Sequence, residues 1–382
     1  MFAHNESENT IPLSLYIHMP WCVQKCPYCD FNSHTIKQSP DYSAYIDHLI
    51  CDLEADLVLC QQRTIHSIFI GGGTPSLFSA ELINTLLSKI HQRIPIADHA
   101  EITIEANPNS VDAARFDGYI QAGINRISVG VQSFQADKLT KLGRIHNPQE
   151  AIDAANLLHH LDLRSFNLDL MHGLPNQSLD DALFDLKQAI NIKPTHLSWY
   201  QLTIEPNTLF GSNPPVLPHE DSLWEIYQQG HQLLIASGYE QYETSAYSKV
   251  GLQCQHNLNY WRFGDYLGIG CGAHGKLTQQ EGHIIRTVKT RHPKGYLQGR
   301  YVAKSYVVAQ EDLPFEYFMN RFRLFEPTPK DEFERRTFLP LKRVENQIEQ
   351  AIEKGYLTQT QHHLQITEHG KLFLNSLLEL FL

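Results

Sequence analysis

The chain has 382 residues, of which 42% are hydrophobic and 19% are charged. This apolar content excludes a mainly disordered protein, and the length fits two or three domains or one barrel with an appendage. The net charge of −11, with no basic run, argues against general nucleic-acid binding.

The sequence shows no sign of a membrane span or an export signal. No apolar stretch approaches the roughly 18 residues that a spanning helix needs. The first ten residues, MFAHNESENT, are polar and acidic rather than basic and then apolar. We therefore expect a cytoplasmic protein whose contact with any membrane is peripheral. Disulfide frameworks are rare in that compartment, so the close spacing of three of the seven cysteines indicates metal binding.

Strand and helix patterns alternate along the first 200 residues. The predicted strands are 13–19, 67–70, 101–107, 126–134, 166–175 and 196–204. The predicted helices between them are 41–60, 79–90, 111–122, 151–161 and 180–190. Such alternation predicts a parallel sheet with helical crossovers, and about six units favour a partial (β/α)6 barrel of α/β class over a closed barrel of eight. Polar residues gather at the carboxyl ends of these strands, the edge at which parallel barrels carry their sites.

The remainder of the chain divides by composition. A loop-rich stretch and a helix at 222–237 complete a barrel region at 12–250, after a polar tail at 1–11. Residues 251–312 form a connecting segment. Residues 313–382 have helices, a short two-stranded wing and a last helix, which is typical of a winged-helix-like module. Its nine basic and ten acidic residues give no positive surface for DNA, so we interpret it as a cap or docking module.

Cys22, Cys26 and Cys29 form a C-x3-C-x2-C pattern. Thiolates are soft ligands that suit iron–sulfur clusters and zinc. A structural zinc site needs four ligands, which His18 or His34 would complete. A four-iron cluster on three cysteines leaves one iron open to a chelating molecule. Spacing alone leaves both interpretations open.

The surrounding residues carry a family resemblance. The triplet follows the segment YIHMPWC (16–22), Tyr28 precedes its last cysteine, and GGGTPS (71–76) lies about forty residues downstream. The combination resembles the radical S-adenosylmethionine (SAM) superfamily, in its coproporphyrinogen-dehydrogenase-like branch, over nearly the whole chain. The resemblance implies a [4Fe-4S] cluster on Cys22, Cys26 and Cys29. It implies a SAM site formed by Tyr16, Tyr28, Gly72, Gly73, Thr74, Glu105, Gln132, Arg144 and Asp169.

That branch contains oxygen-independent coproporphyrinogen III dehydrogenases and HemW-type haem chaperones. Asp30 and Phe31 follow the triplet where the dehydrogenases have a further cysteine, and only about a dozen residues precede the first strand. The segment HNLNYW (256–261) is similar to the H-N-x-x-Y-W motif of the chaperone group. These three features favour the chaperones.

The predicted function is therefore haem binding and delivery, with haem, the cluster and SAM as the bound groups. His256 would ligate haem iron, while Asn257, Tyr260 and Trp261 complete the motif, and the two aromatic rings would give a flat apolar surface for the porphyrin. The expected partners are haem-accepting proteins, membrane-bound ones included, and a second copy of the chain. The sequence leaves open whether the cluster and SAM support enzymatic turnover or regulate haem transfer or oligomerisation, and it favours the second. The alternative is a coproporphyrinogen III dehydrogenase-type oxidoreductase.

Three weaker patterns were also considered. Cys254, His256, Cys271 and His274 could hold zinc, as a minor alternative. The glycines of 270–275 fit G-x-G-x-x-G, but no convincing strand precedes them, which argues against a dinucleotide site. Cys51 and Cys60 lie on opposite faces of a predicted helix and are interpreted as buried apolar side chains.

Overall fold

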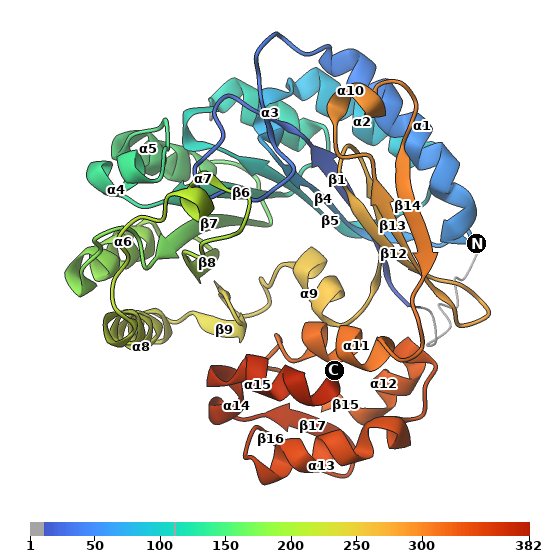
Figure 1. Cartoon of the computed structure of the whole chain (residues 1–382). Helices are drawn as coiled ribbons and strands as arrows, with labels where there is room; N and C mark the ends of the chain where they lie inside the picture. The colour runs from blue at the N-terminus through green and yellow to red at the C-terminus, as the bar shows by residue number, and fades with distance from the viewer. Residues whose placement is uncertain (1–10, 111) are drawn as a thin grey trace.

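The computed structural model describes residues 11–110 and 112–382. Six strand–helix units come first, and the structure confirms the partial barrel (Figure 1). Their elements are β1 (Leu13–Met19), α1 (Tyr42–Cys60), β4 (Ile65–Gly72), α2 (Ala80–His91), β5 (Ile96–Ala106), α3 (Ala113–Gln121), β6 (Arg126–Gln132), α4 (Ala136–Lys141), α5 (Pro148–Leu158), β7 (Ser165–His172), α6 (Leu179–Ile192) and β8 (His196–Gln201). Two further strands, β2 (Trp21–Cys22) and β3 (His34–Thr35), pair within the loop after β1.

The helices begin where short polar side chains can cap them. The Asp41 carboxylate accepts a hydrogen bond from the Ala44 amide at 2.9 Å, and Ser79 caps α2 in the same manner. Asn147 and Glu150 form a reciprocal capping box at the start of α5. These caps satisfy amide groups that have no partner inside the helix, which fixes each helix start from local sequence.

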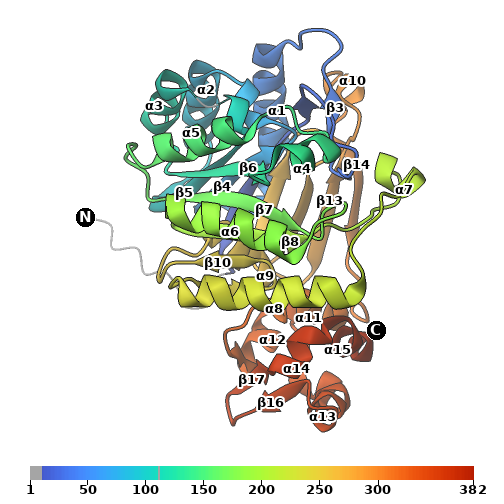
Figure 2. The same cartoon turned by 90° about the vertical axis from the view of Figure 1, so that its left-hand side faces the viewer.

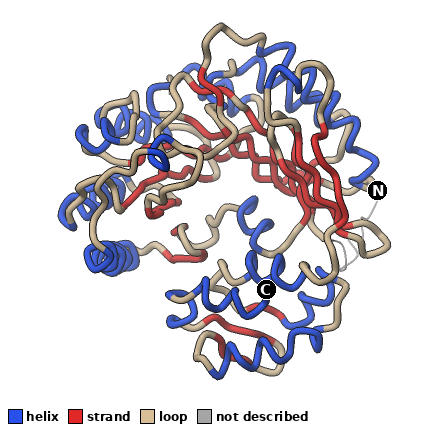
Figure 3. The backbone as a smooth tube through the Cα atoms, in the orientation of Figure 1, coloured by secondary structure: helices blue, strands red, loops and turns tan. Residues whose placement is uncertain are grey.

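The chain then builds both ends of the same sheet. The elements after β8 are α7 (Leu209–Ser212), α8 (Glu220–Ala236), β9 (Glu240–Glu243), β10 (Ala246–Ser248), α9 (Gln255–Trp261), β11 (Asp265–Ile269), β12 (His274–Thr278), β13 (Ile284–Lys289), α10 (Pro293–Tyr296) and β14 (Val302–Val307). The sheet has twelve strands in the order β14-β13-β12-β11-β1-β4-β5-β6-β7-β8-β10-β9. It curves into an open arch with helices on its convex side (Figures 1 and 3).

Strand β11 corrects one sequence-based statement. It runs parallel to β1, with Leu13 opposite Asp265, and it ends directly before Gly270. A strand therefore does precede the glycine pattern of 270–275. The element that follows is strand β12, however, not a helix, so the pattern lacks the helix N-terminus on which a dinucleotide site depends.

The C-terminal elements have a separate apolar core. They are α11 (Leu313–Arg321), β15 (Thr328–Pro329), α12 (Lys330–Thr337), α13 (Glu345–Glu353), β16 (Leu357–Gln359), β17 (His363–Ile366), α14 (Glu368–Leu372) and α15 (Leu374–Leu378). The predicted wing is present as β16 and β17, and β15 adds a third strand to it. These elements lie beside α9 and below the open side of the arch (Figures 1 and 2).

Helix α1 tests the expectation that Cys51 and Cys60 are both buried. Cys60 is buried, as expected, but Cys51 is exposed, so its interpretation as a buried side chain was wrong. The two cysteines are nine positions apart, which turns one of them to solvent on a helix packed on one side only.

Over residues 11–110 and 112–382, no helix combines the length and apolar character needed to cross a bilayer.

A buried ion network attaches the later strands to the first helix. Lys289 on β13 donates to Asp52 at 2.5 Å and to Asp56 at 2.6 Å, both on α1. Asp52 also accepts from the Tyr296 hydroxyl at 2.7 Å and from the Gly270 amide at 3.0 Å. One lysine thus bridges two buried carboxylates, and the Asp52 carboxylate holds α10 and the loop after β11 in place.

Replacing Lys289 by methionine should destabilise the protein strongly. The change leaves Asp52 and Asp56 buried without a counter-charge, which costs about 3–5 kcal/mol. Urea denaturation followed by circular dichroism measures the loss. The control is Lys89→Met, which removes a surface pair with Asp47 at 2.6 Å and should change stability by about 0–1 kcal/mol. Equal midpoints for the two variants would contradict this account of the network.

Candidate functional site

The three predicted cluster cysteines lie on one loop at the carboxyl end of β1. The amide of Cys29 donates to the Cys26 carbonyl at 3.2 Å, which makes a tight turn, and the loop ends are joined by β2 and β3. All three thiols are partly exposed and none is in a disulfide. Burial raises the pKa of Cys22 and of Cys29. The loop therefore carries three free, partly exposed thiols within eight residues, the donor type that an iron–sulfur cluster takes, each on a different iron.

The zinc alternatives find no support in this geometry. Among the described residues, no three side chains of His, Cys, Asp or Glu converge on a single ion position. The Cys254 thiol lies 3.5 Å from the Glu101 carboxylate, whereas the Cys271 thiol lies 3.1 Å from the Arg291 carbonyl. The thiols of Cys254 and Cys271 thus have different protein partners.

Arg144 lies against the cysteine loop. Its guanidinium is 3.6 Å from the Cys26 sulfur and also donates to the Asn107 side chain and the Gly130 carbonyl, each at 2.7 Å. Asn107 in turn donates to the Thr74 hydroxyl at 3.1 Å. Arg144 is therefore part of the cysteine environment rather than a solvated surface charge, and Asn107 belongs to the same set although the sequence reasoning did not select it.

The glycine segment ends β4 beside the same loop. The amides of Gly73 and Thr74 donate to the carbonyls of Met19 at 2.7 Å and Trp21 at 2.8 Å. Gly72 has a φ of +111°, and a Cβ on it would lie 2.5 Å from the His18 ring. The fold itself thus requires glycine here, through backbone conformation and packing, in addition to any ligand that approaches.

Glu105, at the end of β5, faces Gly72. Its carboxylate accepts from the Gly72 amide at 3.0 Å. Burial, reinforced by the nearby charge of Asp169, raises the pKa of Glu105 to about 8. A largely protonated carboxyl in a cavity wall is a group that would ionise when a cation binds next to it.

The other residues selected from the sequence are distributed around this centre. Gln132 has a backbone φ of +69°, and its side-chain oxygen accepts a hydrogen bond from the Tyr200 hydroxyl at 2.9 Å. Asp169 accepts from Ser128 at 3.1 Å and from Asn167 at 2.8 Å. Tyr28, on the cysteine loop, packs against Phe210, with ring centroids 6.4 Å apart. Gln132, Asp169 and Tyr28 thus have protein partners and do not line the cavity described below.

Helix α9 carries the H-N-x-x-Y-W residues, and a buried carboxylate holds it to the sheet. Glu101 on β5 accepts from the amides of Gln255 at 2.8 Å and His256 at 3.3 Å. The first turn of α9 is thereby capped from the neighbouring strand, which satisfies amides that the helix cannot satisfy itself. The position of His256 is set by this contact.

The motif residues occupy two different faces of α9. His256 and Tyr260, four positions apart, turn toward the sheet and pack edge to face with centroids 4.8 Å apart. Trp261 lies instead against the guanidinium of Arg323 in the C-terminal elements, 5.0 Å from its ring. Asn257, four positions before Trp261, is half-buried. Tyr260 and Trp261 therefore do not form one flat wall, because successive helical residues point about 100° apart.

His256 is a buried imidazole with one free nitrogen. His256 is only 1% exposed. Its Nδ1 lies 3.0 Å from the Ser67 hydroxyl, and its Nε2 has no hydrogen-bond partner among the described residues. Burial lowers the pKa of His256 to about 3. The ring is therefore neutral, and in the tautomer that donates from Nδ1 to Ser67, Nε2 offers a lone pair of the kind that binds iron.

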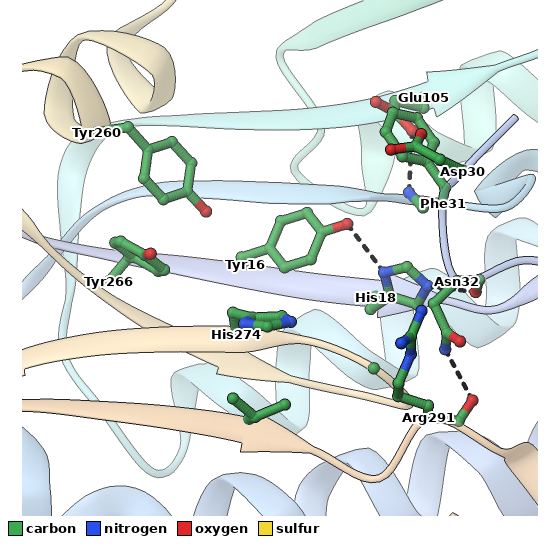
Figure 4. Close-up of a pocket in the computed structure, with 13 residues that line it drawn as sticks. Tyr16, His18, Asp30, Phe31, Asn32, Glu105, Tyr260, Tyr266, His274 and Arg291 are labelled. Atoms are coloured by element: carbon green, nitrogen blue, oxygen red, sulfur yellow. Dashed lines mark hydrogen bonds between the residues drawn. The ribbon is translucent and has the colours of Figure 1, made fainter. Parts of the chain in front are cut away.

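A cavity of about 600 Å³ joins the two groups of residues. Four of the residues selected from the sequence line it: Tyr16, Gly72, Glu105 and Tyr260. Figure 4 shows Tyr260, Tyr266 and Tyr16 toward one end and Glu105, His18 and Arg291 toward the other. The remaining lining residues are Asp30, Phe31, Asn32, Gly272, His274 and Val288.

Several of these lining residues were missed by sequence reasoning. Tyr266, His274 and Arg291 come from the strands and loop that follow α9, which reach the site only through the pairing of β11 with β1. No local pattern marks Tyr266 and Arg291, whereas His274 was selected only as a zinc candidate. His18 was likewise selected only as a zinc ligand, although it alternates with Tyr16 along β1, and its ring nitrogen lies 3.0 Å from the Tyr16 hydroxyl.

The chain matches known protein families and curated relatives. Residues 16–188 match the Radical SAM superfamily, and residues 308–373 match the HemN C-terminal domain. "Heme chaperone HemW" of Escherichia coli (strain K12) is 64% identical over 371 residues, which cover 97% of this chain and 98% of that protein. The protein of the same name from Bacillus subtilis (strain 168) is 30% identical, over 97% of this chain and 99% of that protein.

Among solved structures, the chain is similar to coproporphyrinogen III oxidase (HemN) from Escherichia coli, described as a radical SAM enzyme. The TM-score is 0.83 at 21% sequence identity, over 97% of this chain and 90% of the other. At that identity the likeness establishes the fold alone. The two relatives named HemW match over nearly their whole length, at 64% and 30% identity. This chain belongs to the HemW family of radical SAM proteins.

Proposed function

We propose that this protein binds haem and delivers it to haem-accepting proteins, on a scaffold that holds a [4Fe-4S] cluster and SAM. The observation that carries the proposal is the shared cavity, which Tyr260 of the H-N-x-x-Y-W helix lines together with Tyr16, Gly72 and Glu105. The 64% identity to a protein named heme chaperone HemW supports the same function. In this proposal the protein acts in the cytoplasm, and residues 313–382 dock the recipient protein. Membrane-bound proteins are among the proposed recipients. A homodimer is one assembly to test.

Cys22, Cys26 and Cys29 would hold the cluster, because they are three free, partly exposed thiols on one loop. When bound, the cluster supplies an open iron that SAM can chelate. Arg144 would hold the loop at Cys26, from whose sulfur its guanidinium is 3.6 Å. The segment Gly72–Thr74, fixed to the cysteine loop by backbone hydrogen bonds, would position SAM beside that loop.

His256 would ligate haem iron through the nitrogen that has no protein partner. The ring is fixed on one side by Ser67 and packs against Phe69, with centroids 5.2 Å apart. His256 is 1% exposed and does not line the cavity, and Tyr260 packs edge to face on its ring, so Tyr260 would have to move for haem iron to reach the imidazole. Tyr16, Tyr260 and Tyr266 give the cavity the aromatic lining that a tetrapyrrole requires.

The test of function combines haem transfer with a turnover assay. Anaerobically purified, cluster-reconstituted protein should bind haem, seen as a Soret band, and should pass it to an apo-haem protein such as apomyoglobin. With SAM, a reductant and coproporphyrinogen III it should form no protoporphyrinogen IX. Robust conversion would overturn the proposal in favour of a coproporphyrinogen III dehydrogenase.

His256→Ala should shift the Soret band and weaken haem binding by about tenfold, because an axial ligand is lost. The matched control is His66→Ala, on the same strand as Ser67 but paired with His99 outside the cavity. An unchanged Soret band in His256→Ala would remove this residue as a ligand.

The cluster assignment predicts different outcomes for two cysteines. Cys26→Ser should lower the iron content of the reconstituted protein and abolish its broad visible absorption, because serine is a poor ligand for this cluster. Cys51→Ser, which changes an exposed cysteine on α1, should leave both unchanged. Iron analysis and absorption spectroscopy measure the result. Full iron loading of Cys26→Ser would sink the assignment.

SAM binding should release a proton near pH 7. The pKa of Glu105 is raised by burial from 4.5 to about 8, so the group is mostly protonated before binding. A cationic sulfonium nearby lowers that pKa and drives the proton off. Isothermal calorimetry at pH 7, in buffers of different ionisation enthalpy, should count up to about one proton per site, and the release should vanish well above pH 8.

The variant Glu105→Gln should bind SAM without this proton release. Glu243→Gln is the control, because burial raises the pKa of Glu243 to about 7 but the residue does not line the cavity. Equal proton release from wild type and Glu105→Gln would show that another group titrates.

A further inference from the structure

The cavity has two chemically different ends. Tyr16, Tyr260 and Tyr266 line one end, and the basic residue Arg291 lies at the other, beside His18 and Asn32 (Figure 4). An aromatic chamber with a cation at one end is complementary to a flat apolar ligand that carries an acid group on one edge.

The backbone of Arg291 is fixed by the cysteine loop. Its carbonyl accepts from the Asn32 side chain at 2.9 Å, from the His34 ring at 3.1 Å and from the Cys271 thiol at 3.1 Å. The Asn32 side chain also donates to the Cys271 carbonyl at 2.8 Å. Arg291 thus extends from a fixed anchor, although its side chain is exposed.

The guanidinium of Arg291 has no acidic partner within the part of the chain that the structure describes, whereas its neighbours do. Arg286 pairs with Glu316 and Arg262 with Glu326, each at 2.6 Å. Asp30 lines the same cavity but forms no ion pair with Arg291 over residues 11–110 and 112–382. A free guanidinium at a cavity wall is suited to bind a carboxylate in a bidentate manner.

A second cavity, of about 420 Å³, meets the first at Arg291. Asp30, Phe31, Asn32 and Arg291 line both. The arginine therefore lies where a cavity lined by tyrosines meets a more polar one. A ligand in the first cavity would present its polar edge at this point.

We infer that Arg291 binds a propionate of haem and so orients the ring, with its apolar body against the tyrosines. This inference rests on the proposed function and names the residue that recognises the acid groups of the cargo. Each haem has two propionates, and esterification removes their charge without changing the ring. The carboxylate of SAM is the other acid that could reach this arginine, and the experiment below separates the two.

The test measures affinity for haem, haem dimethyl ester and SAM in the full-length, cluster-reconstituted protein. Arg291→Gln should weaken haem binding by about tenfold, because one charged hydrogen-bonded contact is lost. The ester should bind wild type about tenfold more weakly than haem does, and it should bind Arg291→Gln and wild type equally. This non-additivity identifies the arginine and the propionate as partners.

Two further variants complete the design. Arg291→Lys keeps the charge and should recover part of the affinity for haem. Arg300→Gln changes another exposed arginine, outside both cavities, and should leave all three affinities unchanged. SAM affinity should be unchanged in Arg291→Gln.

The contrary outcomes are distinct. If Arg291→Gln weakens haem and its ester equally, the residue has a merely structural effect and the inference is overturned. If SAM affinity falls while haem affinity holds, Arg291 binds the SAM carboxylate instead. If wild type binds haem but Arg291→Gln binds it as tightly, only this assignment fails. A wild-type protein that binds no haem would remove the proposed function itself.

Discussion

The position of β1 between β4 and β11 is the constraint on which the site depends. All three strands run parallel, with Ile17 opposite both Ile70 and Ile269. Their carboxyl ends consequently meet at one edge of the sheet, where the loop of Cys22–Cys29, the glycines that end β4 and the loop of Gly270 lie together. Parallel pairing of this kind aligns segments that are about 250 residues apart in the chain, and it explains why the cavity has one wall from each end of the sequence.

Burial then sets the chemistry of that edge. Glu105 is held largely protonated and His256 fully neutral, because a low-polarity environment disfavours both charges. Neither group has all of its hydrogen-bonding capacity taken up by neighbouring residues. Glu105 keeps one hydrogen bond, to Gly72, and His256 keeps a nitrogen without a partner. Glu105 lines the cavity and can respond to a cation that enters it, whereas His256 lies behind the cavity wall, so its free nitrogen becomes accessible only if the wall moves.

Physical attachment also links the cysteine loop to the opposite wall. Asn32 and His34 follow the third cysteine directly, and both donate to the carbonyl of Arg291. The position of the arginine therefore depends on the conformation of the loop that would hold the cluster. On the far side, α9 connects the cavity with the C-terminal elements through Trp261 and Arg323. The proposed cofactor, cargo and docking regions are thus in direct mechanical contact.

The sequence determined the features that have a local cause. Capping side chains such as Asp41 and Ser79 fix helix starts, alternating apolar residues define the six strand–helix units, and the spacing of Cys22, Cys26 and Cys29 marks the metal loop. Tertiary structure decided the rest. It joined Tyr266 and Arg291 to Tyr16 through the pairing of β11 with β1, which leaves no local pattern, and it turned Trp261 away from Tyr260. A strand pairing is chosen by which distant segment buries its surface best, so no window of sequence around either partner can specify it.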